Sequence, residues 1–283
     1  MFELYIENDR KERLNLSQAV KEYSILSVKG LNPPGATINL SDVSGLDGAR
    51  FNSSKIEIRN VVITLKIEGD IEENRLKLYD FFRVKQYTKV CYKNGKRDVT
   101  IEGYVESFDC DFFTQDEQAQ ISILCPDSYW QDAFEFIADI SQIIAKFEFP
   151  FSIPGEGIEF STYNEHLVAE VINVGDVETG VLIQIDVIGS VKHLRIYNAD
   201  TRAVFGFNYD LQYGDYVEID SRTGSKGIYL LRDGKRINLI NYLDKGITWL
   251  TLKQGINTFT YTTEDGTEYL LIKIATVNKY SGV

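Results

Sequence analysis

Residues 120–130, Gln-Ile-Ser-Ile-Leu-Cys-Pro-Asp-Ser-Tyr-Trp, carry the strongest structural signal in this chain. The pattern places Ile121, Ile123 and Cys125 at every second position, between Gln120, Ser122 and Leu124, which is the period of a β-strand with one buried face. Pro126 ends the pattern because it has no backbone N–H to donate to a sheet. The stretch therefore predicts a strand that stops at a proline and leaves through an aromatic-rich segment.

A second alternating pattern lies about sixty residues earlier. Its apolar positions change parity across Asn60, from even to odd numbers. A period of two predicts a strand, and the change of parity predicts a β-bulge within it. The strand is expected to be long enough to project beyond its own domain. The apolar positions are Ile56, Ile58, Val61, Ile63, Leu65 and Ile67.

One helix and one hairpin are expected between these strands. Asp70, with Glu73 three residues later, fits an N-cap and its partner, and we predict a helix from there roughly to Tyr87. The dipeptide Asn94-Gly95 stands between two apolar runs and predicts a two-residue β-hairpin turn. The first domain is therefore expected to be a sheet with one helix.

The second half is expected to be entirely β. Val181, Ile183, Ile185 and Val187 alternate, and glycine-containing turn signals recur at short intervals, which favours a sandwich or jelly roll. We place an inter-domain crossing at residues 131–154 because two of the five prolines fall near its end. The predicted domains are residues 1–130 and 155–283.

Composition narrows the class of protein. The chain has 283 residues, a formal net charge of −12 and 43% hydrophobic residues, enough for a substantial core. An acidic chain binds phosphate backbones poorly, so we do not expect specific nucleic-acid binding. The start of the chain lacks a signal-peptide pattern, and no apolar run is long enough to span a membrane, so we expect synthesis in the cytoplasm.

No metal, cofactor or catalytic pattern is apparent. Cys91, Cys110 and Cys125 are too few and too widely spaced for a disulfide framework, and we expect buried thiols. His166 and His193 belong to no metal-binding motif. We therefore expect neither a metal nor a cofactor.

The acidic pairs do not indicate an enzyme either. Glu218 with Asp220, and Glu264 with Asp265, are carboxylate pairs that an acidic chain contains by chance. Glycosidase chemistry needs two carboxylates that face each other across a cleft. Glu218 and Asp220 share one face of a predicted strand, a geometry that is possible for such chemistry but ordinary for a solvated strand face, and the solvated face is favoured. The acidic segment at residues 42–48 lacks the ligand spacing of an EF-hand and is interpreted as a turn.

Several segments together resemble the distal tail protein family (Dit) of phages and prophages with long tails. Their order and spacing carry the resemblance, which runs almost from end to end. They are residues 30–34 (GLNPP), 46–50 (LDGAR), the strand that bears Arg59, 74–79 (NRLKLY), Arg97, 125–127 (CPD), 149–154 (FPFSIP), 173–180 (NVGDVETG), 214–220 (GDYVEID), 249–257 (WLTLKQGIN) and 280–283 (YSGV).

The resemblance implies a mainly β protein with a ring-forming N-terminal domain and a C-terminal galectin-like β-sandwich. It implies a hexameric hub that joins the tail tube to the tip or baseplate and lets DNA pass, and an acidic wall would repel the DNA. The implied partners are further copies of the chain, the tail tube protein, and a tail-associated lysin or receptor-binding protein. The implied location is the virion tail, assembled in the cytoplasm of the bacterial host.

Two sets of residues are candidates for function. The strand residues Val61, Ile63, Leu65 and Ile67 are predicted to form an inter-subunit belt, since buried apolar anchors dominate interfaces. The alternative function is a carbohydrate-binding module that attaches to the host cell wall, with Trp249 as the candidate sugar contact, although a core role for that tryptophan is favoured. A wall-degrading hydrolase ranks last.

Overall fold

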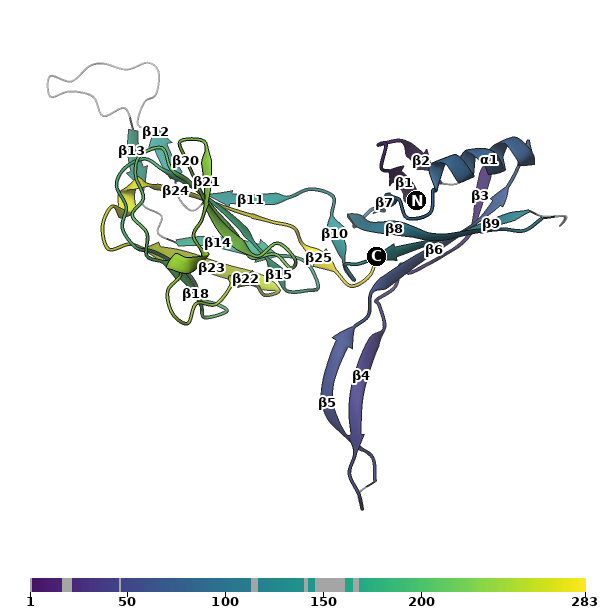
Figure 1. Ribbon diagram of the computed structural model, residues 1–283, viewed down its shortest axis with the longest axis horizontal. Helices are drawn as coiled ribbons and strands as arrows, with labels where there is room; N and C mark the ends of the chain where they lie inside the picture. The colour runs from purple at the N-terminus through teal and green to yellow at the C-terminus, as the bar shows by residue number, and fades with distance from the viewer. Residues whose placement is uncertain are drawn as a thin grey trace. The chain divides into compact units, whose positions relative to one another are not determined.

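The chain folds into two compact units (Figure 1). The computed structural model describes residues 2–16, 22–45, 47–112, 117–139, 142–145, 161–164 and 168–283, the side chains of 142–145 and 161–164 excepted. Unit 1 comprises Met1–Ala133 and Lys279–Val283, and unit 2 comprises Phe134–Asn278. The chain thus passes from unit 1 into unit 2 and back again.

This division differs from the predicted one in two places. The predicted second domain included the last five residues, but Lys279–Val283 belong to unit 1. The predicted crossing at 131–154 contains strands instead, with β10 (Trp130–Asp132) in unit 1 and β11 (Phe136–Asp139) in a sheet of unit 2. The proline-containing residues 147–154 lie outside the described residues. Pairing between distant strands, which leaves no local signal, decides both boundaries.

Unit 1 is built on one antiparallel sheet. Its strand order is β2-β1-β7-β8-β9-β6-β3, and β10 pairs with both β8 and the C-terminal strand β25. The strands are β1 (Glu3–Asn8), β2 (Arg13–Asn15), β3 (Tyr23–Lys29), β6 (Arg59–Ile67), β7 (Tyr87–Lys93), β8 (Asp98–Cys110), β9 (Gln118–Cys125) and β25 (Lys279–Tyr280). A separate two-stranded ribbon is formed by β4 (Ala36–Asp42) and β5 (Ala49–Ile56).

The alternating pattern of residues 120–130 forms β9, as predicted. Ile121 and Ile123 are fully buried, and opposite them in the pairing lie Ile63 and Val61 of β6. Directly opposed residues of an antiparallel pair point to the same face, so these strands bury one common surface. That surface is part of the core of unit 1.

The predicted bulge at Asn60 is wrong. β6 pairs with β9 in continuous register from Arg59 to Lys66. The single predicted strand is in fact two strands, β5 and β6, which is why the parity of the apolar residues changes. Between them, at Glu57 and Ile58, the chain leaves the ribbon and enters the sheet. A parity change can mark a break between strands as well as a bulge.

Helix α1 (Ile71–Phe81) begins as predicted and ends earlier. The Asp70 side chain accepts a hydrogen bond from the backbone N–H of Glu73 at 3.1 Å, which caps the first turn. Leu78 and Phe82 are buried in the core of unit 1. The helix ends at Phe81, short of the predicted limit, and Tyr87 is instead the first residue of β7.

The β7–β8 hairpin is present, but its loop has four residues rather than two. The Asn94 side-chain oxygen accepts hydrogen bonds at 2.8 Å from the backbone N–H groups of Lys96 and Arg97, and the pairing resumes at Lys93 and Asp98. Asparagine side chains commonly mimic a backbone turn in this way. That local bond replaces the predicted two-residue turn.

Unit 2 is a β-sandwich. Its larger sheet has the order β11-β24-β16-β19-β20-β21 and its smaller sheet the order β14-β23-β17-β18. The larger sheet contains, besides β11, β24 (Leu270–Thr276), β16 (Leu182–Val187), β19 (Tyr216–Asp220), β20 (Gly227–Arg232) and β21 (Lys235–Asn238). The smaller sheet contains β14 (Val168–Asn173), β23 (Gly255–Thr262), β17 (Leu194–Asn198) and β18 (Ala203–Phe207).

The two sheets of unit 2 share one core. Ile183 and Ile185 of β16 and Phe205 and Phe259 of the smaller sheet are completely buried in it. The predicted alternation around β16 and the prediction of a mainly β protein are confirmed, and the galectin-like detail stays a prediction. The remaining elements are the pairs β12 (Gln142–Ala145) with β13 (Ser161–Asn164) and β15 (Thr179–Gly180) with β22 (Thr251–Leu252), and the 3₁₀ turns η1 (Ile240–Tyr242) and η2 (Thr267–Tyr269).

The three cysteines are free thiols. Cys91 and Cys125 are buried, as predicted, while Cys110 is only half-buried. Burial raises the pKa of the Cys125 thiol to about 12. At neutral pH this side chain is therefore protonated and behaves as a small apolar group.

We predict that Ile63→Asp unfolds unit 1. The substitution places a carboxylate at a position with no exposed surface, at a cost of about 3–5 kcal/mol. Thr64→Asp is the matched control, because Thr64 lies on the other, partly exposed face of β6. Tryptophan fluorescence of the buried Trp130 and thermal unfolding measure the difference. Equal stability of the two variants would show that the β6 face is not part of a tightly packed core.

Candidate functional site

The candidate site is the ribbon formed by β4 and β5. Every residue in both strands is exposed, and neither strand pairs with another strand among the described residues. Figure 1 shows it as a long two-stranded element that leaves the sheet of unit 1. An isolated two-stranded ribbon is marginally stable in water, so this one is expected to be completed by contact with another surface.

One face of the ribbon is apolar. Leu40 lies opposite Phe51, and Ala36 lies opposite Ile56. The register shifts between Asn39 and Leu40, where Asn52 is the extra residue of a β-bulge. This shift brings Phe51 onto the same face as Ile56, although their spacing is odd. We call this face the apolar ribbon face; its large residues are Ile38 (59% exposed), Leu40 (58%), Phe51 (60%) and Ile56 (39%).

The opposite face is polar and is hydrogen-bonded within the ribbon. Asn39 Nδ2 donates to Ser53 Oγ at 2.9 Å, and Ser41 Oγ donates to Asn52 Oδ1 at 3.2 Å. On the polar face, side chains of the two strands are hydrogen-bonded to each other. On the apolar ribbon face, large apolar side chains are exposed to water. Contiguous exposed apolar surface of this sort marks an interaction site.

The ribbon is attached to unit 1 through a root made of residues 30–35 and 57–59. Arg59 is 2% exposed, and its guanidinium donates to four backbone carbonyl oxygens among the described residues. The partners are Ser128 (2.9 Å from Nε), Gly30 and Asn32 (2.7 Å) from Nη1, and Ser281 (2.6 Å from Nη2). One buried cation thus joins both sides of the root to the loop after β9 and to the C-terminal segment.

Gly30 is required by this arrangement. Its φ is +87°, and a Cβ built on it would lie 2.3 Å from the carbonyl oxygen of Asn60 and 3.0 Å from the Cα of Val61. No side chain fits against backbone at that distance. The glycine therefore lets the chain turn closely past β6 as it enters the root.

The predicted belt residues lie elsewhere. Val61, Ile63, Leu65 and Ile67 are at most 2% exposed and belong to the core of unit 1. Their own chain already covers them, so their side chains have no free surface for a neighbouring subunit. We therefore move the proposed contact to the ribbon, whose apolar residues precede β6. The apolar residues of β6 and those of the ribbon have the same sequence pattern. Only the packing of side chains in the folded chain distinguishes the buried β6 residues from the exposed ribbon residues.

Trp249 is half-buried in unit 2. Its ring centroid lies 5.0 Å from that of Phe205, and the ring packs against the sandwich core. Lys226 Nζ lies 5.9 Å from the ring centroid. The favoured packing role is compatible with this geometry, and the sugar contact stays a prediction.

His193 links three segments of unit 2. Its Nδ1 lies 2.7 Å from Glu264 Oε1, and its Nε2 lies 2.9 Å from Asp244 Oδ1. Because ionised carboxylates only accept hydrogen bonds, this geometry favours the imidazolium, in which both ring nitrogens donate. The hydrogen bonds to Asp244 and Glu264 raise the pKa of His193 above its usual 6.5. His166 lies outside the described residues.

The remaining carboxylate pairs also take part in structural contacts. Asp220 binds the guanidinium of Arg222 through both oxygens, at 3.0 Å to Nε and 2.7 Å to Nη2. Glu218 lies 3.8 Å from Arg236. Within the described part of the chain, no group of three or more His, Cys, Asp or Glu residues is placed to hold a metal ion. No helix there is long and apolar enough to cross a membrane.

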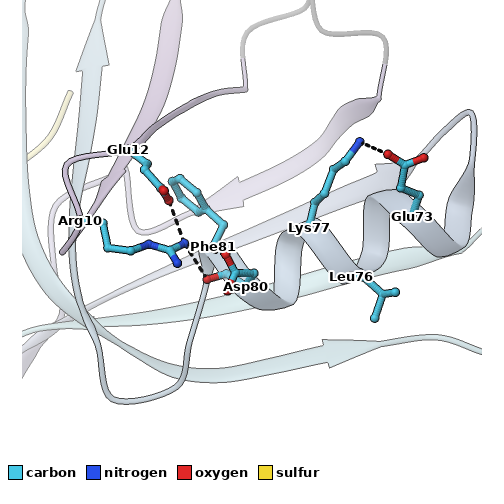
Figure 2. A pocket seen from close by; sticks show the side chains of 7 residues that line it. All are labelled: Arg10, Glu12, Glu73, Leu76, Lys77, Asp80 and Phe81. Atoms are coloured by element: carbon cyan, nitrogen blue, oxygen red, sulfur yellow. Dashed lines mark hydrogen bonds and ion pairs between the residues drawn. The ribbon is translucent and has the colours of Figure 1, made fainter.

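An open groove of about 370 Å³ lies beside α1, and Figure 2 shows the side chains that line it. Its charged residues form ion pairs with one another, Arg10 with Asp80 at 2.9 Å and Lys77 with Glu73 at 2.7 Å. The hydrogen bond from Arg10, followed by that from Arg83, lowers the pKa of Asp80 to about 2. A carboxylate held ionised in this way is a poor general acid, so the groove does not suggest catalysis.

We predict that Arg59→Met destabilises unit 1 by about 3–5 kcal/mol, because it removes a buried guanidinium that donates hydrogen bonds to four backbone carbonyl oxygens. Arg83→Met is the control, since Arg83 forms an exposed ion pair with Asp80. Chemical denaturation followed by Trp130 fluorescence measures both. A cost below 1 kcal/mol for Arg59→Met would contradict the role of the buried cation.

We also predict a pH dependence in unit 2. Because the pKa of His193 is raised in the folded state, the imidazolium contributes its full stabilisation of unit 2 below about pH 6.5. This contribution is lost as the pH rises through the pKa of the folded state. The wild-type melting temperature should therefore fall, relative to that of His193→Asn, as the pH rises above the usual histidine pKa of 6.5. Asparagine is chosen because His193 has φ +51°, which asparagine tolerates. Parallel pH profiles would contradict the assignment.

Part of unit 2 matches a known family. Residues 174–274 match the model of the siphovirus-type tail component, C-terminal domain. No curated protein matches the chain in the sequence comparison. The family match therefore rests on the sandwich and not on the ribbon.

Solved structures resemble the whole chain. The crystal structure of SPP1 Dit (gp 19.1), described as a paradigm of the hub adsorption apparatus in phages that infect Gram-positive bacteria, has 13% sequence identity and a TM-score of 0.68, with 98% of each chain covered. A chain of the phage P2 baseplate in its activated conformation with Ca has 11% identity and a TM-score of 0.52, with 100% of each chain covered. Residues 174–274 thus match the C-terminal domain of the siphovirus-type tail component family, and the whole chain has a fold similar to that of the distal tail protein Dit, as the sequence resemblance indicated.

Proposed function

We propose that this protein is a structural hub of a phage or prophage tail tip, and that copies of it form a closed ring, a hexamer by the sequence resemblance. The ring would join the tail tube to the tip or baseplate and let DNA pass. The observation that carries the proposal is the apolar ribbon face, which is exposed along its whole length. The role is structural rather than catalytic.

A second copy of the chain is the partner we propose for the ribbon. A face that meets a different surface on the next subunit makes a head-to-tail contact, and such contacts close into rings when the rotation between subunits permits. The likeness to a hub protein and to a baseplate chain supports assembly in a tail. In the ribbon, unlike in the other described strands of unit 1, every residue of both strands is exposed.

The other proposed partners lie along the tail. They are the tail tube protein on one side and a tail-associated lysin or receptor-binding protein on the other. The net charge of −12 supports passage of DNA without binding, because like charges repel within a narrow channel. Specific nucleic-acid binding is not part of the proposal.

We predict that Leu40→Asp with Phe51→Asp abolishes self-assembly and leaves both units folded. The two charges would lie on the apolar ribbon face, where a contact would bury them without partners. Ser41→Asp with Ser53→Asp adds the same charge to the polar face of the ribbon and serves as the matched control. Light scattering and negative-stain microscopy over a range of concentrations measure the oligomer.

Three results would be decisive. Assembly by the control and by wild type, but not by the apolar-face variant, supports the proposal. Equal assembly by both variants moves the contact away from the ribbon. A wild-type chain that stays monomeric at every concentration contradicts self-assembly of the isolated protein.

A further inference from the structure

The C-terminal segment Lys279–Val283 is built into unit 1. Tyr280 of β25 lies opposite Trp130 of β10, and Lys279 Nζ contacts Asp127 Oδ2 at 2.7 Å. Arg97 donates to the carbonyl oxygen of Gly282, and its guanidinium carbon lies 4.3 Å from the centroid of the Tyr280 ring. Strand pairing, an ion pair and a cation–π contact therefore hold these five residues in place.

The same segment lies directly on the ribbon root. Ser281 accepts one of the four hydrogen bonds of Arg59, and the backbone N–H of Val283 donates to Leu31 at 3.1 Å. A Cβ built on Gly282 would lie 2.9 Å from Pro33 Cδ. The segment thus contacts the part of the chain that leads from β3 into β4.

We propose that Lys279–Val283 is a latch that fixes the direction in which the ribbon leaves unit 1. The ribbon strands pair only with each other among the described residues, so contacts at the root decide where the ribbon points. Among the other described contacts at the root, the Glu57 N–H donates to the Gly35 carbonyl at 3.0 Å and joins its two sides. Ser128 Oγ, in the loop after β9, donates to the Glu57 carbonyl at 2.6 Å. The latch contacts one of these two sides, the one formed by residues 31–33.

A fixed root favours assembly for an entropic reason. A ribbon already held in its bound direction loses less conformational freedom on contact, which strengthens binding without any new contact. This part of the inference rests on the proposed ring, whereas the effect of the latch on the root does not. Because the chain leaves unit 2 at Asn278 and enters the latch at the next residue, the latch also connects the end of unit 2 to the ribbon root.

The test is Gly282→Val in the full chain. The added side chain must displace either the latch or the rigid Pro33 ring, because the first of its atoms meets that ring at 2.9 Å. Gly95→Val is the matched control, since nothing lies within 4 Å of a Cβ at Gly95 and its φ is not positive. Hydrogen exchange of the Glu57 amide reports on the root, and light scattering reports on assembly.

We expect exchange at Glu57 to rise by about tenfold or more in Gly282→Val and to be unchanged in Gly95→Val. We expect Gly282→Val to require a higher protein concentration for assembly. The exchange is measured again in the Leu40→Asp, Phe51→Asp background, so that the result holds for the monomer as well. Unit 2 should melt as in wild type.

Each other outcome overturns a defined part of the inference. Unchanged exchange in Gly282→Val refutes the latch, whether or not the protein forms a ring. Faster exchange with normal assembly refutes the link between the latch and the ring contact. Faster exchange in Gly282→Val, together with a wild-type protein that never assembles, leaves the latch standing and refutes the self-assembly on which the proposed function rests.

If Gly282→Val fails to fold, Arg97→Met decides the question. This variant removes the hydrogen bond to the Gly282 carbonyl and the contact with the Tyr280 ring, and it adds no bulk at Pro33. The latch requires faster exchange at Glu57 in Arg97→Met than in Lys96→Met, its neighbour in the same loop. Equal rates would refute it.

Discussion

The buried guanidinium of Arg59 is the interaction on which the arrangement of unit 1 depends. It is surrounded by carbonyl oxygens from segments that are far apart in the chain, between Gly30 and Ser281. Burial lowers the pKa of Arg59, but an arginine keeps its charge at any pH at which the protein is folded. A permanent cation that can donate in several directions is suited to joining backbone segments that have no side chain to offer. The ribbon root, the loop after β9 and the C-terminal segment are therefore fixed by one residue.

The ribbon and the sheet share a pattern of alternating apolar residues, but these residues face different environments in the two elements. In β6 the alternating apolar residues face the core, and in β4 and β5 they face solvent. The bulge at Asn52 is what gives the ribbon a single apolar face, because it corrects the odd spacing between Phe51 and Ile56. Bulges commonly redirect side chains in this manner. An exposed apolar face and a core can thus be adjacent in sequence and still be separated by a break of two residues.

The two units contribute different kinds of information about this protein. The family match falls within unit 2, whereas the uncovered apolar surface lies in unit 1. Unit 2 has a closed core that contains residues of both its sheets, and its carboxylates are engaged by His193, Arg195 and Arg222. Loops that connect the strands of such a core lie at the surface and are free to vary.

The sequence alone determined the mainly β character, the start of the helix at Asp70, the strand at β9 and the alternation of β16, because each depends on a local period or cap. It also carried the resemblance to the distal tail proteins. It misplaced the bulge, the hairpin loop and the last five residues, and it assigned the inter-subunit belt to residues that are buried in the core of unit 1. A period of two says that one face of a strand is apolar, but not whether that face meets its own core or solvent. Only the tertiary structure decided that, because burial is a property of what packs opposite a strand, and in this chain those partners are far away in sequence.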